Sequence, residues 1–186
     1  ARALLAGDAL QALAFELLTP EGDAVPPAMQ ADLCRLLACA SVAHGMAGGQ
    51  AIDLASVGKP LAEPELRAMH RLKTGALLQG SVRMGAACAS DVPTAARKAL
   101  DNYGAAIGLA FQVVDDILDV TADSAALGKT AGKDAAADKP TYVSLLGLAA
   151  SQALADELRA QAHGAPDASG LRDLSRLRDL VLNRKN

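Results

Sequence analysis

One run of the chain limits the possible folds more than any other: Phe111-Gln-Val-Val-Asp-Asp-Ile-Leu-Asp119, in which three carboxylates interrupt an otherwise apolar stretch. At about 100° of helical rotation per residue, its polar side chains fall within an arc of roughly 100°, and the apolar ones cover the rest of the circumference. The polar residues are Gln112, Asp115, Asp116 and Asp119, and the apolar residues are Val113, Val114, Ile117, Leu118 and Val120. The pattern predicts a mostly buried helix that carries one solvated acidic stripe.

The acidic stripe needs a positive partner, because like charges four residues apart destabilise a helix by roughly 0.2–0.5 kcal/mol per pair. Mg²⁺ suits this role, since it binds oxygen ligands through one or two carboxylates, keeps several waters and completes its shell with substrate phosphates. The alternative is a solvated helix face that binds nothing. The acidic run by itself does not distinguish the two.

Composition favours an all-α protein. Hydrophobic residues make up 51% of the chain and are largely Ala and Leu, whereas aromatic residues make up 2% and Trp is absent. Such a composition is typical of closely packed helices rather than sheets. The length of 186 residues fits a single domain with a substantial core.

Charge and hydropathy exclude two classes of partner. The net charge is −3, with 18 basic and 21 acidic residues interspersed, so no basic surface for nucleic acid is expected. The longest stretch without charged residues, 36–52, contains His44, Gln50 and three glycines, which makes it a poor membrane span.

The cysteines are odd in number and lack CxxC spacing, so we expect reduced thiols within the core of a cytoplasmic protein. They are Cys34, Cys39 and Cys88.

Apolar periodicity and breaker residues predict the helices. They cover residues 3–18, about 29–43, 63–88, 94–121, 143 to about 162, and 171–181, with a loop at 164–167. Glycines at 104 and 108 within the long helix indicate close packing or bending, because glycine costs about 1 kcal/mol relative to alanine inside a helix.

Two polar pairs lie on the predicted helices outside the acidic run. Gln50 and Asp53 are three residues apart, on one helical face, directly after a glycine pair. Lys73 is followed by Thr74, and an ammonium beside a hydroxyl can meet a phosphate oxygen from two sides. Taken singly, Asp53 also suits a cap or surface position, and Lys73 suits a surface lysine. We expect His70 to be solvent-exposed or at the edge of the core.

A glycine-containing loop with several lysines follows the acidic helix, and it includes Lys129 and Lys139. It is not a Walker A loop, because no strand precedes it and the upstream glycine is missing at the required spacing. A cationic segment beyond an acidic helix end is suited to closing over an anion that a metal bridges. A solvated loop is the alternative.

Taken together, these segments resemble the trans-type isoprenyl diphosphate synthases. The motifs are Gly-Gly-Gln-Ala-Ile-Asp, Lys-Thr-Gly-Ala-Leu, Phe-Gln-Val-Val-Asp-Asp-Ile-Leu-Asp, Gly-Lys and Asp-Lys-Pro-Thr-Tyr, in this order. The resemblance covers nearly the whole chain and is strongest to bacterial short-chain members, the farnesyl diphosphate synthases. It implies the isoprenoid-synthase helical bundle around a central cavity, and a homodimer.

The resemblance also implies a reaction. In this family an allylic diphosphate, dimethylallyl or geranyl, is bound through Mg²⁺, with three ions per active site expected. It ionises to a carbocation, which alkylates isopentenyl diphosphate to give farnesyl diphosphate in isoprenoid biosynthesis, and diphosphate is released. The chain would therefore be part of a prenyltransferase.

Site residues follow by resemblance. Asp115 resembles the direct metal ligand, and Asp116 and Asp119 resemble residues of the metal site that either hold metal-bound water or lie behind the direct ligand. Lys73, Asp115 and Lys129 are the expected catalytic residues. Lys73, Thr74, Gln112, Lys129 and Lys139 resemble contacts to the allylic substrate. Gln50, Asp53 and Asp134 resemble groups that orient these lysines and waters.

One part of the family pattern is missing from these residues. The first aspartate-rich motif and the arginines that follow it should precede residue 3. We therefore expect residues 1–186 to be a single domain, the C-terminal two-thirds of a prenyl diphosphate synthase, and to lack synthase activity alone. Two other readings remain: a non-catalytic subunit that keeps the fold, and a class I terpene cyclase, whose Asn/Ser/Glu-type second motif fits Asp-Asp-Ile-Leu-Asp less well.

Overall fold

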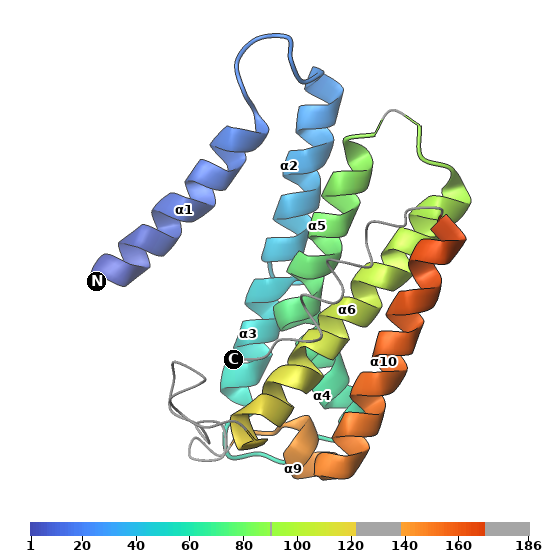
Figure 1. The fold of residues 1–186 in the computed structure, drawn as a ribbon. Helices are drawn as coiled ribbons and strands as arrows, with labels where there is room; N and C mark the ends of the chain where they lie inside the picture. Colours follow the sequence, from blue (N-terminus) through green and yellow to red (C-terminus); the bar gives the residue numbers. More distant parts are fainter. Residues whose placement is uncertain (90, 122–138, 170–186) are drawn as a thin grey trace.

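A computed structural model describes residues 1–89, 91–121 and 139–169 (Figure 1). Every regular element in these ranges is helical, which confirms the all-α prediction. The elements are α1 (Arg2–Leu18), α2 (Pro27–Ser41), α3 (Met46–Ala55), α4 (Glu63–His70), the π-helix η1 (Arg71–Gly75), α5 (Ala76–Ala87), α6 (Thr94–Thr121), α9 (Tyr142–Leu146) and α10 (Leu148–Ser169). The predicted helix at 171–181 lies outside the described residues.

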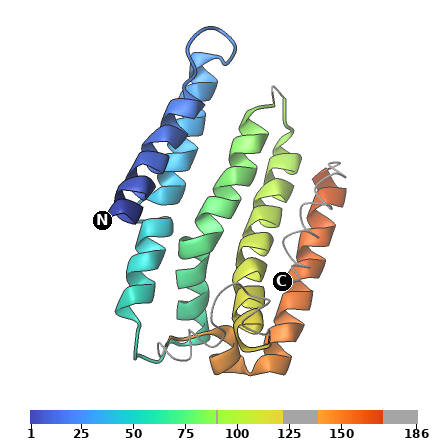
Figure 2. The same ribbon diagram turned by 60° about the vertical axis from the view of Figure 1, so that its left-hand side comes forward.

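The long helix α6 is the centre of the fold. It packs against α5 on one side and along α10 on the other, while α2 packs on the far side of α5 (Figures 1 and 2). The short helix α9 contacts α4, α6 and α10 at one end of the bundle. Helix α1 lies at the edge and contacts α2. None of the described helices has both the length and the apolar character needed to cross a lipid bilayer.

Glycines let helix backbones approach one another, as predicted for the long helix. A Cβ atom added at Gly108 would lie 2.7 Å from Gly75 Cα, and one added at Gly104 would lie 3.0 Å from Gln79 Cα. A Cβ atom at Gly49 would overlap the backbone nitrogen of Lys73. The π-helix η1 is therefore held between α3 and α6 at backbone contact.

The predicted 63–88 helix is interrupted by η1. Its start is conventional, with Pro64 in the first turn and the Glu65 carboxylate accepting a hydrogen bond from the Ala62 N–H at 2.8 Å, as expected at a helix N-terminus. The π-helical turn then carries Lys73 and Thr74. Such turns are rare within helices and often occur at functional sites.

The C-terminal helices differ from the prediction. The expected 143–162 helix is broken at Gly147, whose φ of 80° ends α9 before α10 begins. Helix α10 then continues through Gly164 to Ser169, where a loop was predicted. Leu158 and Ala162 are buried against the core around α6, so tertiary packing outweighs the local breaker signal.

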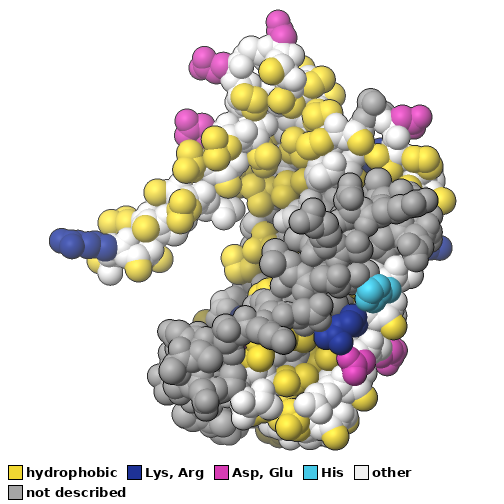
Figure 3. All heavy atoms as spheres, in the orientation of Figure 1, with side chains coloured by type: hydrophobic (Ala, Val, Ile, Leu, Met, Phe, Trp, Pro, Cys, Tyr) yellow, Lys and Arg dark blue, Asp and Glu magenta, His cyan; other side chains and the backbone are white. Residues whose placement is uncertain are grey.

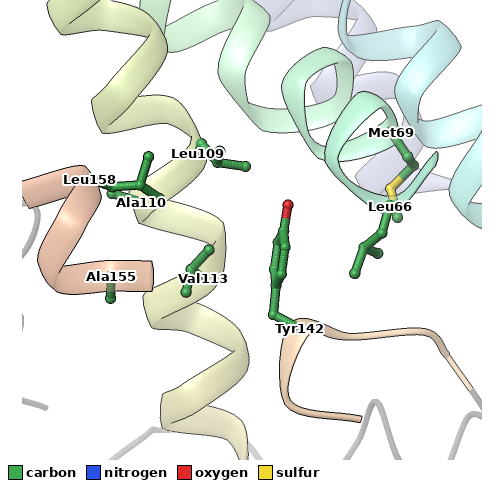
Figure 4. Packing of buried hydrophobic residues seen from close by; sticks show 8 residues of the cluster. All are labelled: Leu66, Met69, Leu109, Ala110, Val113, Tyr142, Ala155 and Leu158. Carbon is green, nitrogen blue, oxygen red and sulfur yellow. The ribbon is translucent and has the colours of Figure 1, made fainter. Parts of the chain in front are cut away.

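The main hydrophobic core joins α4, α6, α9 and α10 (Figure 4). It comprises Leu66, Met69, Leu109, Ala110, Val113, Tyr142, Ala155 and Leu158.

The expected burial of the cysteines was wrong: Cys39 and Cys88 are exposed and Cys34 is half-buried, all as free thiols.

Candidate functional site

Three side chains converge on one carboxylate oxygen, Asp53 Oδ2. Lys73 Nζ lies 2.8 Å from it, Gln50 Nε2 3.4 Å and Lys139 Nζ 3.5 Å. Gln50 and Asp53 come from α3, Lys73 comes from η1, and Lys139 precedes α9. The predicted common face of Gln50 and Asp53 is confirmed by their hydrogen bond.

Two lysines bring positive charge to this group. Asp53 is 3% exposed, and burial alone would raise the pKa of its carboxyl. The hydrogen bond and charge of Lys73, followed by those of Lys139, outweigh burial and hold the pKa of Asp53 below its ordinary value. Two ammonium groups thus share one buried carboxylate. Because both lysine side chains remain more than a quarter exposed, they can also reach an anion in solvent.

A second set of hydrogen bonds links η1, α6 and α9. The Thr74 hydroxyl donates to Gln112 Oε1 at 3.2 Å, and Gln112 Nε2 donates to Asp116 Oδ1 at 2.9 Å. The backbone N–H of Tyr142 donates to Asp116 Oδ2 at 2.8 Å. The Gln112 amide orientation suits both neighbours, because an ionised carboxylate only accepts hydrogen bonds.

The acidic residues of α6 are less solvated than predicted. Asp116 and Asp119 are 2% and 4% exposed, whereas Asp115 is half-buried. The expected solvated stripe is wrong for Asp116, because the backbone at the start of α9 covers its carboxylate. All three aspartates, Asp115, Asp116 and Asp119, were expected at the metal. Within the described ranges, no group of three His, Cys, Asp or Glu side chains is arranged to bind a metal ion.

The donor chemistry nevertheless fits Mg²⁺. This ion takes one or two protein carboxylates and fills its other positions with water and phosphate oxygens. Asp115 is the most accessible of the three carboxylates and lies three residues after Gln112. It is the candidate for such a ligand. The metal role of each aspartate stays a prediction.

His70 was misjudged from the sequence. It is 4% exposed, and its ring stacks on that of Tyr142, with centroids 5.6 Å apart and an interplanar angle of 30°. Among the described residues, the two imidazole nitrogens of His70 have no hydrogen-bond partner. The same is true of the Tyr142 hydroxyl. Burial, assisted by the charge of Lys73, lowers the pKa of His70 to about 4. Burial also raises the pKa of Tyr142 to about 12.

The described site therefore brings together most of the residues that were predicted for it. Gln50, Asp53, Lys73 and Lys139 form one hydrogen-bonded group, and Thr74, Gln112 and Asp116 form the other. Lys129 and Asp134 lie outside the described residues. Sequence reasoning missed the His70–Tyr142 pair, for which the chain offers no signal, since stacking depends on where α9 lies.

Comparison with known proteins identifies the class. Residues 1–172 match the family model for polyprenyl synthetase, and the chain belongs to this family.

Named relatives are prenyl synthases. The chain is 55% identical over 161 residues to a probable farnesyl diphosphate synthase from Bradyrhizobium diazoefficiens, a match that covers 85% of the chain and 48% of the relative. It is 48% identical over 161 residues to the farnesyl diphosphate synthase of Escherichia coli, covering 85% and 53%. The chain thus spans about half the length of the curated relatives it matches.

Solved structures share the fold. The crystal structure of a geranyltransferase from Helicobacter pylori, complexed with magnesium and isoprenyl diphosphate, aligns with a TM-score of 0.87 and 32% identity, covering 98% of this chain and 61% of that one. A putative farnesyl-diphosphate synthase from Marinomonas aligns with a TM-score of 0.81 and 41% identity, covering 97% and 62%. The helical bundle expected from the resemblance is confirmed.

Proposed function

We propose that the protein is a Mg²⁺-dependent prenyltransferase, which condenses isopentenyl diphosphate with dimethylallyl or geranyl diphosphate to give farnesyl diphosphate. The observation that carries the proposal is the pair of lysines on Asp53. Lys73 and Lys139 bring two positive charges to one buried carboxylate, 2.8 and 3.5 Å from their nitrogens. Ammonium groups form charge-assisted hydrogen bonds with phosphate oxygens, so this pair is suited to binding a diphosphate.

The residues act by binding and stabilising the leaving group. Lys73 and Lys139 donate to diphosphate oxygens, and the Thr74 hydroxyl joins them when its single O–H turns from Gln112 to the diphosphate. Negative charge that develops as the allylic C1–O bond breaks is met by these donors. Asp115 would hold Mg²⁺, and the ion would supply further positive charge to the diphosphate. Asp53 and Gln112 fix the orientation of Lys73 and Thr74 before substrate arrives. By resemblance, Lys129 is assigned to the same diphosphate, and Asp134 is assigned to orienting the lysines and waters around it.

We also propose a homodimer with α1 at its interface. Leu10, Leu13 and Leu17 recur at helical spacing and are 64%, 42% and 70% exposed, and Figure 3 shows hydrophobic side chains along this helix. An apolar helix face of this kind is expected to be covered. Sedimentation of wild type against a Leu10→Glu, Leu17→Glu variant tests the proposal, which a monomeric wild type would contradict.

The three free thiols of the protein support a cytoplasmic location.

The direct test of function is formation of farnesyl diphosphate from geranyl and isopentenyl diphosphates by the whole protein. On residues 1–186, calorimetry measures inorganic diphosphate binding with and without Mg²⁺. We expect binding that strengthens with Mg²⁺ and weakens by roughly tenfold in Lys73→Met and in Lys139→Met, the loss that one charge-assisted hydrogen bond represents.

Lys98→Met is the matched control, because Lys98 is an exposed lysine near the other end of α6. Its diphosphate affinity should equal that of wild type. A chain that does not bind diphosphate, or binds it equally well in all three lysine variants, would contradict the proposal.

A further inference from the structure

The first residue of α9 is fixed in two ways. The Tyr142 N–H donates to Asp116 Oδ2 at 2.8 Å, a buried hydrogen bond between residues 26 positions apart. The Tyr142 side chain is 0% exposed and lies in the core between α6 and the Leu66–Met69 side of α4 (Figure 4). Backbone and side chain therefore both hold this residue.

The short segment before Tyr142 carries Lys139 towards Asp53. Pro140 has a restricted φ, and Thr141 caps α9: its Oγ1 accepts from the Ser144 N–H at 3.0 Å, and its own N–H donates to Ser144 Oγ at 2.9 Å. Little conformational freedom remains between Tyr142 and Lys139. The position of Tyr142 thus limits where the Lys139 ammonium can lie.

We infer that Asp116 is a positioning residue that acts through Tyr142: its carboxylate holds the start of α9 and so places Lys139 beside Asp53 and Lys73. The inference deepens the proposed function, on which it rests only for the diphosphate that Lys139 would bind. Both oxygens of Asp116 accept hydrogen bonds, from Gln112 and Tyr142. This role therefore explains why a carboxylate in the acidic run is 2% exposed.

The geometry separates positioning from metal binding. Asparagine at position 116 can still accept from the Tyr142 N–H, and its amide can donate to Gln112 once the Gln112 amide turns over. Thr74 can accept the reversed bond, since a hydroxyl both donates and accepts. Alanine can do neither. Positioning is therefore rescued by Asn, whereas a requirement for negative charge at the metal is not.

The experiment compares Asp116→Ala and Asp116→Asn with Asp119→Ala, which removes another buried carboxylate of the same helix and leaves the acceptor of the Tyr142 N–H, Asp116, in place. Hydrogen exchange at the Tyr142 amide reports the anchor. The acylation rate of Lys139, measured by mass spectrometry with Lys73 as internal reference, reports where the ammonium lies. Both readouts are independent of catalysis.

Asp116→Ala should speed exchange at the Tyr142 amide by roughly tenfold or more, the change expected for loss of a hydrogen bond to a charged group. It should also raise the Lys139 acylation rate relative to Lys73. Asp116→Asn should recover most of both values, and Asp119→Ala should leave them as in wild type. Unchanged Lys139 acylation in Asp116→Ala would overturn the inference.

Binding of inorganic diphosphate with Mg²⁺ provides a second arm. We expect the affinity lost in Asp116→Ala to be largely absent in a Lys139→Met background, because both changes remove the same contact. Equal losses in Asp116→Ala and Asp116→Asn, additive with Lys139→Met, would assign Asp116 to the metal instead. If the protein binds no diphosphate while exchange and acylation respond as expected, the proposed function fails and the role of Asp116 stands.

Should Asp116→Ala not fold, Tyr142→Leu tests the same connection from the other side. It keeps the backbone N–H but removes the aromatic anchor from the core. Faster Lys139 acylation in this variant supports the inference, and an unchanged rate contradicts it.

Discussion

The Lys73 ammonium lies 2.8 Å from the Asp53 carboxylate, although the residues are 20 positions apart on different helices. The contact depends on Gly49, where any Cβ atom would overlap the Lys73 backbone. Because α3 and η1 touch at backbone distance, the Lys73 side chain is placed beside a carboxylate that is itself buried. A glycine thus determines the geometry of the proposed anion site.

Gly49→Ala should therefore destabilise the protein strongly. A Cβ atom that meets backbone cannot be accommodated by a rotamer change, so we expect the free energy of unfolding to fall by about 3 kcal/mol. Urea denaturation measures the change. Gly85→Ala is the control: nothing lies within 4 Å of the added Cβ, and its free energy of unfolding should rise by about 0.5–1 kcal/mol. Similar results for both variants would contradict the close approach.

Asp53→Asn should weaken the fold at neutral pH. The change leaves Lys73 and Lys139 without their shared negative charge, and we expect a loss of about 2 kcal/mol, less than for a fully buried pair because both lysines are partly exposed. The pKa of Asp53 is lowered below its ordinary 3.8, so its contribution is complete above that value and is lost as the pH falls further.

Urea denaturation at neutral and acidic pH measures this difference. The wild type and Asp53→Asn should converge once Asp53 is protonated. Asp156→Asn serves as control, because the Asp156 side chain is 71% exposed in its pair with Arg159 and exposed pairs contribute little. Equal stability of wild type and Asp53→Asn at neutral pH would refute the prediction.

Periodicity was sufficient to predict the main helix of the site. The predicted bounds of 94–121 are those of α6, because Pro93 marks its start and the apolar pattern continues to its end. The polar residues of the site were predicted from motifs and their order. The contact between Gln50 and Asp53 within α3 was also predicted, because residues three apart lie on one helical face.

What could not be predicted depends on contacts between distant segments. The burial of Asp116 depends on a backbone N–H at Tyr142, and backbone groups carry no sequence signal. The burial of His70 depends on the same residue. The π-helical turn at Arg71–Gly75 has a sequence compatible with an ordinary α-helix, and Gly164 remains helical because the preceding turns of α10 pack on the core.

His70 should make stability depend on pH. Its pKa is lowered from 6.5 to about 4, first by burial and then by the charge of Lys73. Between these values the unfolded chain binds a proton that the folded protein does not. The free energy of unfolding should therefore fall as the pH drops from 6.5 to about 4, by at most about 3 kcal/mol from this residue.

Chemical denaturation across this pH range checks the expectation. His70→Phe keeps a ring against Tyr142 and should remove this part of the pH dependence, whatever its effect on absolute stability. His163→Gln, at an exposed histidine, should retain it. A His70→Phe profile parallel to wild type would show that His70 is not the responsible group.

Tyr142→Phe should stabilise the protein. The Tyr142 hydroxyl is fully buried and has no hydrogen-bond partner among the described residues. Leaving such a group unpaired costs about 1–3 kcal/mol, so its removal should raise the free energy of unfolding by about 1 kcal/mol. The raised pKa of about 12 adds a pH signature. Above pH 10 the unfolded chain loses a proton that the folded protein keeps, so wild-type stability should fall between about pH 10 and 12.

In Tyr142→Phe this alkaline loss should be reduced, and urea denaturation at neutral and alkaline pH measures both effects. Tyr103→Phe is the matched control, because Tyr103 is also buried, at 1% exposure, but its hydroxyl is not among the unpartnered atoms. It should gain no stability. A loss of stability in Tyr142→Phe would mean that the hydroxyl has a partner. The His70–Tyr142 stack would then need to be described as a hydrogen-bonded pair rather than a packed one.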